Sequence, residues 1–311
     1  MIYKQEKFML YLQLKGQSPR TREGTLGAVI NFEKWLKQEN IKYEQISHHD
    51  ILAYINTFKQ GGSKAITIQK VVLNLKHYYT FLMQEDDVKD NPCSNISIKG
   101  VQRKYLYKTY SREELEEVYR KYVNAPLTKH AFALVTQKQH NIILGLIIYQ
   151  GLRVDEIKRL KVSDLQLREG KITIVSTKRT AGRILKLEAH QLYELMDYVH
   201  VTRKEVQQQR DNQKTLIPKE VDKAQLFISP LVSANLNATM KRVLLKLRLY
   251  LPQLADLKQI RGSVISNWLK EYDLRKVQYL AGHKYVSSTE AYKANNLEDL
   301  KEEVNRYHPD F

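Results

Sequence analysis

Residues 142–149 form the most apolar run in the chain, with the sequence IILGLIIY. A membrane-spanning helix needs about 20 apolar residues, so this run is too short to cross a bilayer. It predicts instead a helix buried at the centre of a domain. The run leads directly into Gly151, Leu152 and Arg153. A glycine turn at the end of a buried helix would hold the guanidinium of Arg153 on rigid structure.

Two segments rich in alternating, β-branched residues follow, at 171–175 and 183–187. The STKRTAG sequence between them predicts a tight turn and therefore a small antiparallel hairpin. Lys178 lies in this turn, from which its side chain can reach over a bound ligand. Ser111 and Glu114 have the spacing of a capping box, which starts a helix. We expect a mainly α fold with a small antiparallel β-sheet in the C-terminal domain. The helices expected there cover residues 112–122, 188–209, 231–249, 255–270 and 274–280.

Helical patterns also fill the N-terminal part of the chain. The first covers about 4–15, and the second begins after Ser18-Pro19. The third begins after the turn-like SHHD sequence at 47–50, and the fourth begins at Ser63. The last pattern has a stripe of apolar residues, which predicts a buried face. That stripe consists of Ile68, Val72, Leu75, Tyr79 and Leu82. The opposite face is polar and cationic, and it either contacts DNA in a groove or is an ordinary solvated face. The candidate DNA-binding residues on that face are Thr67, Lys70, Asn74 and His77, with Ser63 at its start.

The sequence Asp90-Asn91-Pro92 ends this first region, because proline cannot continue a helix. The next residues, 93–109, have little periodicity and contain several cations and tyrosines. We expect an interdomain linker there, with Arg103 and Lys104 on nucleic-acid backbone; a plain solvated linker is the alternative. The expected domains are therefore 1–92, the linker 93–109, and 110–311.

The charge balance favours a polyanionic partner. The chain has 51 Lys and Arg against 34 Asp and Glu, a formal net charge of +17, and such an excess is typical of nucleic-acid binding. The cations are spread along the chain and not gathered beside an apolar segment, which argues against a membrane partner. Cys93 is the only cysteine, so no internal disulfide is expected. The N-terminus lacks the apolar core of a signal peptide, and we expect a cytoplasmic protein located at nucleic acid.

The stretch at 280–293, LAGHKYVSSTEAYK, combines a turn with a short helix. Gly282 turns the chain, His283 follows, and Ser287 with Glu290 has capping-box spacing before Tyr292. Cutting a phosphodiester without a metal requires cations around the phosphate, a proton donor for the leaving oxygen, and a nucleophile. Taken singly, each candidate has an ordinary structural explanation. The candidates for these roles are Arg153, Lys178, Arg261, His283 and Tyr292.

The order and spacing of these residues resemble the tyrosine recombinases of the phage integrase family over nearly the whole chain. The resemblance rests on QGLRVDEIKRL, STKRTAGRILKL, KQIR, LAGH and TEAY. It implies that Arg153 and Arg261 are the catalytic arginines, and that Glu156 is an acidic residue behind them. The hairpin lysine maps onto Lys178, with Arg183 and Leu187 in register. The remaining positions map onto His283 and the nucleophile Tyr292. The sequence departs from the family at Lys258, where a histidine is usual; an ammonium can also donate to a phosphate oxygen.

This resemblance implies a four-helix, SAM-like core-binding domain followed by an α+β catalytic domain. It implies cleavage of double-stranded DNA at a specific recombination site through a 3′-phosphotyrosyl bond, with no cofactor, metal or ATP. Lys178 would protonate the departing 5′-hydroxyl. Glu156 would orient the active-site cations; its alternative is a local ion pair with Lys158 or Arg159. Strand exchange would require a dimer on each site and a tetramer in the synapse.

The C-terminal segment 297–307 is acidic and amphipathic. It is expected to dock either on a neighbouring protomer or on its own domain. About a hundred residues precede the catalytic domain, so we expect no separate arm-binding domain. A Xer-type resolvase and the integrase of a mobile element both fit a prokaryotic or phage protein of this size. The departure at Lys258 favours the mobile element slightly.

Three other functions are compatible with parts of the sequence. A type IB topoisomerase would use the same chemistry on one duplex. A DNA-binding protein of the same fold without cleavage is suggested by Lys258. A metal-dependent nuclease has the least support, because no Asp, Glu and His residues have ligand spacing. The nearest candidate, His48-His49-Asp50, is typical of a helix start.

Overall fold

The computed structural model describes residues 4–101, 108–126, 131–211, 224–229 and 236–293. The chain divides into two compact units, Met1–Lys104 and Tyr105–Phe311. Each unit has its own core of buried apolar side chains. The two units are therefore described separately.

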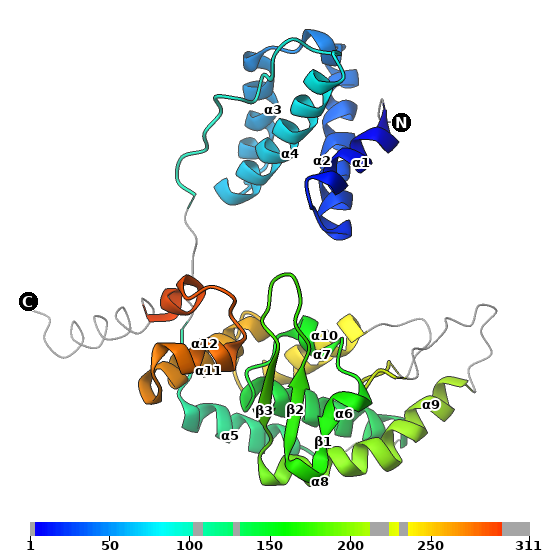
Figure 1. Ribbon diagram of the computed structural model, residues 1–311, viewed down its shortest axis with the longest axis vertical. Helices are drawn as coiled ribbons and strands as arrows, with labels where there is room; N and C mark the ends of the chain where they lie inside the picture. Colours follow the sequence, from blue (N-terminus) through cyan, green and yellow to red (C-terminus); the bar gives the residue numbers. More distant parts are fainter. Residues whose placement is uncertain (1–3, 102–107, 127–130, 212–223, 230–235, 294–311) are drawn as a thin grey trace, which may run out of the picture. The chain divides into compact units, whose positions relative to one another are not determined.

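The first unit is helical (Figure 1). Its core includes Phe8, Phe32 and Tyr79, each fully buried. The apolar stripe predicted on the last helix is confirmed, because all five of its side chains are buried. The elements of this unit are α1 (Gln5–Leu14), α2 (Pro19–Gln38), the 3-10 turn η1 (Tyr43–Gln45), α3 (His48–Gln60) and α4 (Ala65–Gln84).

Helix α3 begins earlier than the sequence predicted. Ser47 is its N-cap: the Ser47 hydroxyl accepts from the amide of Asp50 at 3.3 Å, and the Asp50 carboxylate accepts from the amide of Ser47 at 2.8 Å. These reciprocal bonds satisfy two free amide groups at the helix start. The SHHD sequence is thus the cap and first turn of α3, and His48-Asp50 is a helix start, as proposed.

The predicted linker, 93–109, is shortened at both ends by packing. Cys93 is fully buried in the first core, and Ile96 and Ile98 pack against the same core. At the other end, the carbonyl of Lys108 accepts from Gln259 Nε2 at 2.9 Å. The amide of Tyr110 donates to Ser263 Oγ at 3.0 Å. Residues assigned to the linker from composition are therefore anchored to one unit or the other.

The second unit is mainly helical with one small antiparallel sheet, which confirms the expected fold class. The strands are β1 (Leu165–Gln166), β2 (Lys171–Ile174) and β3 (Arg183–Lys186), in the order β1-β2-β3. The register pairs Ile172 with Leu185 and Ile174 with Arg183. Two short 3-10 turns, η2 (Val162–Asp164) and η3 (Leu167–Glu169), flank β1. The helices are α5 (Arg112–Val123), α6 (Ala131–Ile148), α7 (Val154–Ile157), α8 (Ala189–Asp197), α9 (Arg203–Asp211), α10 (Leu236–Leu247), α11 (Leu257–Glu271) and α12 (Leu274–Ala281), and a further helix covers 287–293.

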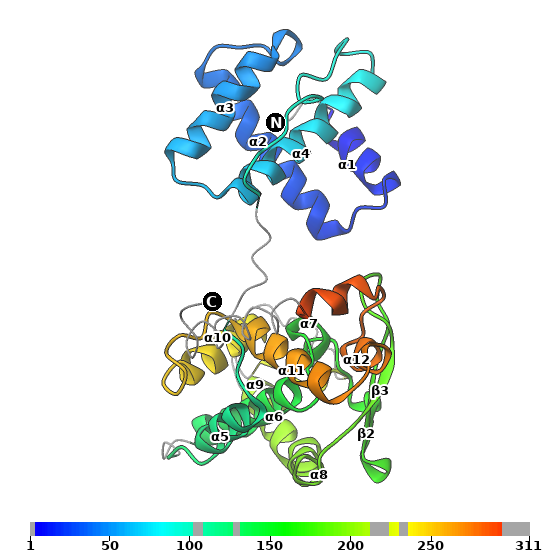
Figure 2. The same cartoon turned by 90° about the vertical axis from the view of Figure 1, so that its left-hand side faces the viewer.

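Helix α6 is the central element of this unit, as the apolar run predicted. Ile143, Leu144 and Ile147 are fully buried. The helix packs against α5, α8, α10 and α11, and Figure 2 shows it enclosed among the other helices. Helix α5 carries the predicted capping box of Ser111 and Glu114. The burial of α6 and the cap of α5 both follow from local sequence patterns.

The long polar helix expected at 188–209 is present with one irregularity. A π-helical turn, η4 (Tyr198–Thr202), joins α8 to α9. On the other side of the unit, α12 lies beside β3 (Figure 2). The hydroxyl of Tyr279 on α12 donates to the carbonyl of Ile184 at 3.2 Å and accepts from its amide at 3.1 Å. Within the described part of the chain, no helix is both long and apolar enough to span a membrane.

Candidate active site

The turn after α6 places Arg153 at the start of α7. Gly151 has a φ of +57°, and a Cβ atom there would lie 2.8 Å from the ring of Trp268. Only glycine fits both the backbone conformation and the close approach. Arg153 is the N-cap of α7, and its amide donates to Glu156 Oε2 at 2.9 Å. Arg153 is half-buried.

Glu156 forms a two-point ion pair with Arg183 of β3. Arg183 Nη1 donates to Oε1 at 2.8 Å and Nη2 donates to Oε2 at 3.0 Å. Both residues are buried, with exposed fractions of 3 % and 4 %. Arg261 Nη1 lies 3.8 Å from the same carboxylate, whereas Lys158 pairs with Asp155. The partner of Glu156 is therefore a cation of the site and not the local Lys158 or Arg159.

The carboxyl group of Glu156 is held in its ionised form. Burial raises its pKa, but the hydrogen bonds and charge of Arg183 outweigh burial, and the net pKa lies below the usual value. The arrangement satisfies the rule that a buried charge needs a hydrogen-bonded counter-charge. Glu156 thus neutralises one guanidinium and fixes the turn that carries Arg153.

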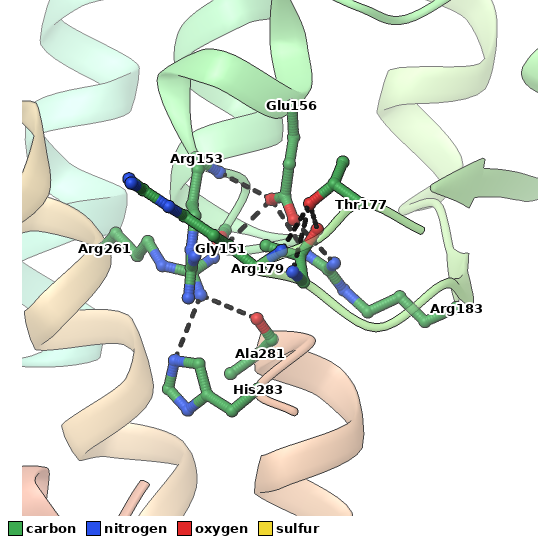
Figure 3. Close-up of polar contacts among 10 residues, drawn as sticks. Gly151, Arg153, Glu156, Thr177, Arg179, Arg183, Arg261, Ala281 and His283 are labelled. Carbon is green, nitrogen blue, oxygen red and sulfur yellow. Dashed lines mark hydrogen bonds and ion pairs between the residues drawn. The ribbon is translucent and has the colours of Figure 1, made fainter. Parts of the chain in front are cut away.

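Arg261 projects from α11 into the same cluster and is 5 % exposed. Its guanidinium donates to the carbonyl of Gly151 and, at 2.7 Å, to the carbonyl of Ala281. Burial, and then the charge of Arg153, lower its pKa to about 9. It therefore stays a cation at neutral pH. These bonds tie the end of α6 to the end of α12 (Figure 3).

Gly282 ends α12 and sets the position of His283. It has a φ of +63°, and a Cβ atom there would lie 2.2 Å from Nη1 of Arg183. His283 is 5 % exposed, with Nε2 3.4 Å from Arg261 Nη2 and Nδ1 2.9 Å from Thr289 Oγ1. Burial, followed by the charges of Arg261 and Arg153, lowers the pKa of His283 to about 3. The imidazole is therefore neutral at physiological pH.

Tyr292 lies on the helix at 287–293 and stacks on His283. The two ring centroids are 5.8 Å apart and the ring planes differ by 11°. Its half-buried ring also packs against a small apolar cluster that includes Ile265 and Ala281. The predicted nucleophile thus lies directly beside the predicted phosphate-binding residues.

The capping box predicted at Ser287 and Glu290 is wrong. Ser287 already lies in the helix, and the amide of Glu290 donates to the carbonyl of Val286 at 3.0 Å. A capping box requires that amide to bind the Ser287 hydroxyl instead. The helix starts at residue 287, one residue earlier than a cap at Ser287 would allow.

The hairpin tip that carries Lys178 is attached to the His283 turn. The amide of Thr177 donates to the carbonyl of Thr180 at 2.9 Å, which closes the predicted tight turn. Thr180 pairs with His283 in a β-bridge, and the amide of Ala181 donates to the carbonyl of Gly282 at 3.1 Å. The Lys178 side chain is exposed. Backbone contacts therefore bring this lysine to the edge of the cluster.

Lys258 is exposed in the first turn of α11. It precedes Arg261 by one helical turn, so the two side chains leave the same side of the helix. The structure thus joins Arg153, Glu156, Arg261, His283 and Tyr292 in one contact network and places Lys178 and Lys258 on elements that border it.

Sequence reasoning did not assign a role to two buried residues of this network, Arg183 and Thr289. A signal for Arg183 is its place in β3, where it shares the inward side with Leu185. A charged residue at an inward strand position needs a buried partner. Thr289 has no comparable signal, because one threonine in a short helix is ordinary.

The cluster is suited to bind an anion. Arg153, Arg183 and Arg261 carry three positive charges, and Glu156 compensates one of them. Guanidinium groups bind phosphate oxygens through planar sets of donors. No group of three or more His, Cys, Asp or Glu side chains suited to a metal ion occurs among the described residues.

The predicted DNA-facing stripe of α4 is corrected at one position. Thr67 and Lys70 are exposed and His77 is partly exposed. Asn74 is only 7 % exposed and accepts a hydrogen bond from Thr25 Oγ1 at 3.3 Å. It is buried because α2 packs over this part of α4. Arg103, Lys104 and the segment 297–307 lie outside the described residues.

Comparison with known proteins gives matches over both units. The model of the phage integrase family matches residues 116–299, and that of the phage integrase N-terminal SAM-like domain matches residues 6–86. The tyrosine recombinase XerC of Bacillus pumilus is 27 % identical over 319 residues, covering 97 % of this chain and 95 % of the relative.

Two solved structures share the fold. The XerH recombinase bound to palindromic difH substrate, a post-cleavage complex, matches with a TM-score of 0.69 and 18 % identity over 92 % of this chain and 79 % of that chain. The Tn1549 transposon integrase in complex with circular intermediate DNA matches with a TM-score of 0.62 and 14 % identity over 94 % of this chain and 95 % of that chain.

Proposed function

The chain belongs to the phage integrase family, and we propose that it recombines DNA at a specific site by forming a 3′-phosphotyrosyl bond at Tyr292. The chain is a tyrosine recombinase, an enzyme that cleaves and rejoins DNA. The observation that carries the proposed chemistry is the stacking of Tyr292 on His283. His283 in turn lies beside the buried guanidinium of Arg261. A tyrosine beside a positively charged, anion-binding site has surroundings that favour its use as a nucleophile.

In the proposed reaction, the scissile phosphate sits between Arg153 and Arg261. The two guanidiniums stabilise the charge that develops on its non-bridging oxygens. Tyr292 loses its phenolic proton to solvent, the phenolate attacks phosphorus, and the bond to the 5′-oxygen breaks. Lys178, exposed on the hairpin tip that pairs with the His283 turn, donates a proton to that oxygen. Lys258 donates a further hydrogen bond to the phosphate.

Rejoining reverses these steps. A 5′-hydroxyl of a partner strand attacks the phosphotyrosine, a new phosphodiester forms, and the phenol of Tyr292 is released. Because the bond energy is retained in the covalent intermediate, neither ATP nor a metal ion is required. Glu156 keeps the arginine cluster in place throughout and does not touch the phosphate.

The partner in this proposal is double-stranded DNA at a specific recombination site. Thr67, Lys70 and His77 on α4 supply contacts from the first unit, together with Arg103 and Lys104. Exchange between two sites requires a dimer on each site and a tetramer in the synapse. We place the reaction in the bacterial cytoplasm, since the XerC relative is bacterial. The recombination site on the DNA lies either in a chromosome, as for a Xer-type resolvase, or in a mobile element.

The test begins with the DNA that the protein traps. Cells that express the chain are lysed in denaturant, covalent protein–DNA adducts are recovered, and the DNA is sequenced at the junctions. A nicked suicide duplex with the recovered site is then incubated with the wild-type protein and Tyr292→Phe. We expect a covalent adduct for the wild type only, with equal binding by both, and the same yield in EDTA.

Tyr285→Phe is the matched control, because Tyr285 is an exposed tyrosine just before the same helix. It should form the adduct at the wild-type rate. An adduct formed by Tyr292→Phe would assign the nucleophile elsewhere. Binding without any wild-type adduct would instead favour a DNA-binding protein of this fold.

A further inference from the structure

Thr289 is a fully buried polar residue whose hydroxyl faces the ring of His283. Its exposed fraction is 0 %, and Oγ1 lies 2.9 Å from Nδ1 of His283. On the other side of the ring, Nε2 lies 3.4 Å from Arg261 Nη2. The imidazole is therefore held between two polar partners inside the cluster.

The contact with Arg261 determines which nitrogen carries the proton. A guanidinium has only donors, so Nε2 must accept from Arg261. The neutral ring has one N–H, which is then on Nδ1 and donates to Thr289 Oγ1. Burial and the surrounding arginines lower the pKa of His283 to about 3, consistent with a neutral ring. Arg261 thus selects the tautomer, and Thr289, whose hydroxyl can accept or donate, holds that tautomer in one ring orientation.

Thr289 also connects this ring to the nucleophile. It lies on the 287–293 helix, three residues before Tyr292. Residues with this spacing lie on the same side of a helix. The ring of Tyr292 stacks on the same imidazole at 5.8 Å. One short helix therefore contacts His283 through Thr289 and through Tyr292.

We propose that Thr289 is a positioning residue that holds the His283 ring, in the tautomer set by Arg261, in one orientation and so aligns the phosphate site with Tyr292. This inference rests on the proposed function of His283 and Tyr292. With Nδ1 engaged by Thr289, Nε2 on the Arg261 side of the ring is the nitrogen that faces a bound phosphate. A bound phosphate monoanion favours protonation of Nε2 from solvent, and the resulting imidazolium donates from Nε2 to a phosphate oxygen while Nδ1 still donates to Thr289.

The charges that act on His283 come from three neighbouring elements, and Tyr292 on the 287–293 helix is the titratable group that stacks on its ring. Arg261 on α11, Arg153 before α7 and Arg183 on β3 lower its pKa, and Glu156 on α7 raises it. A bound phosphate adds a negative charge to this set. In the complex the imidazole therefore titrates at higher pH than in the free protein, and the cleavage rate depends on pH through it.

The test uses Thr289→Val and Thr289→Ser in the full chain. Valine has nearly the shape of threonine and lacks the hydroxyl, whereas serine keeps it. The 15N signals of the His283 ring are measured without DNA and assigned by their loss in His283→Gln. We expect Thr289→Ser to keep a protonated Nδ1 and an unprotonated Nε2. In Thr289→Val the Nδ1–H loses its acceptor and the ring loses its fixed orientation, so both signals should shift and broaden; an unchanged pattern would overturn the inference.

Cleavage provides the second measurement, on the suicide duplex recovered for the wild-type protein. Loss of one buried hydrogen bond predicts that Thr289→Val forms adduct about tenfold more slowly, with DNA affinity unchanged and the pH profile shifted. Thr289→Ser should restore the rate. In a His283→Ala background, Thr289→Val should have no further effect. An equal loss in both backgrounds would mean that Thr289 acts only through the stability of its helix.

The two proposals fail in different ways. If the wild-type protein forms no adduct, the proposed function fails while the tautomer measurement still stands. If the wild type forms adduct and Thr289→Val matches it in rate and pH profile, the positioning role of Thr289 is wrong and the proposed function is unaffected.

Discussion

Arg183 and Glu156 form a two-point ion pair that is sealed from solvent, with N–O distances of 2.8 and 3.0 Å. Glu156 lies on α7 and Arg183 on β3, so the pair joins the turn of Arg153 to the hairpin of Lys178. Nη1 of Arg183 also lies under the backbone of Gly282. Three segments that carry candidate catalytic residues therefore meet at one guanidinium.

Breaking this pair on one side should be far more harmful than removing it whole. Glu156→Ala leaves the Arg183 charge buried without a partner, and we expect a loss of about 3–5 kcal/mol in the free energy of unfolding. Glu156→Met combined with Arg183→Met should recover most of that loss, measured by urea denaturation. A Glu156→Ala variant as stable as the double variant would contradict this account.

Gly282→Ala should lower the free energy of unfolding by more than the backbone strain of a left-handed alanine accounts for. That strain alone costs about 1–2 kcal/mol. Gly170→Ala is the matched control: Gly170 has a φ of +64°, and a Cβ atom there would meet only Leu192, at 3.8 Å. The difference between the two variants in urea denaturation measures the clash with Arg183. Equal losses would show that the guanidinium moves away freely.

Lys258 should contribute to cleavage as a phosphate donor. Lys258→Ala is expected to slow adduct formation on the suicide duplex by about 10²-fold, the usual cost of one donor to a charged transition state. Lys258→His should restore much of the rate. Lys270→Ala, at an exposed position in the last turn of the same helix, should have little effect. Wild-type rates for Lys258→Ala would show that the site works without this cation.

Lys70 and Asn74 should behave differently although both belong to the predicted polar stripe of α4. Lys70→Ala should weaken DNA binding uniformly and reduce the slope of log K against log salt by about 1, because one phosphate contact is lost. Asn74→Ala should leave that slope unchanged. It should instead lower stability by about 1–3 kcal/mol, since it leaves the buried hydroxyl of Thr25 without its acceptor. A changed salt slope for Asn74→Ala would return that residue to the DNA surface.

The stability of the protein should fall as pH falls below about 6.5, the value for an unperturbed histidine. Burial is the largest of the effects that lower the pKa of His140 to about 4 and the pKa of His283 to about 3. Between those values and about 6.5 the unfolded chain binds more protons, so acid favours unfolding. From pH 7.5 to pH 5 each histidine should cost about 2 kcal/mol.

His140→Gln isolates one of these contributions. Urea denaturation at both pH values should show a smaller loss for this variant than for the wild type. His200→Gln is the control, because the His200 side chain is exposed. An identical pH dependence in His140→Gln and the wild type would mean that His140 is not responsible.

Local patterns in the sequence determined much of what the structure contains. The apolar run became α6, the Ser111 capping box starts α5, and STKRTAG closes a tight turn. The ordered motifs also identified the residues that meet in the cluster. These features depend on neighbours within a few positions, where periodicity and capping act directly.

The partners within the site were decided by tertiary packing. Glu156 had local cations available and paired with Arg183, 27 residues away in sequence. Asn74 had the periodicity of a solvated position, but α2 covers it. The Ser287 capping box was not formed, and Thr289 became the partner of His283 instead. Burial and hydrogen-bond partners depend on which distant segments come together, and the free energy of a buried polar group depends on those partners. The sequence by itself therefore predicted Tyr292 and its cations as one site, and only the fold determined how they are held.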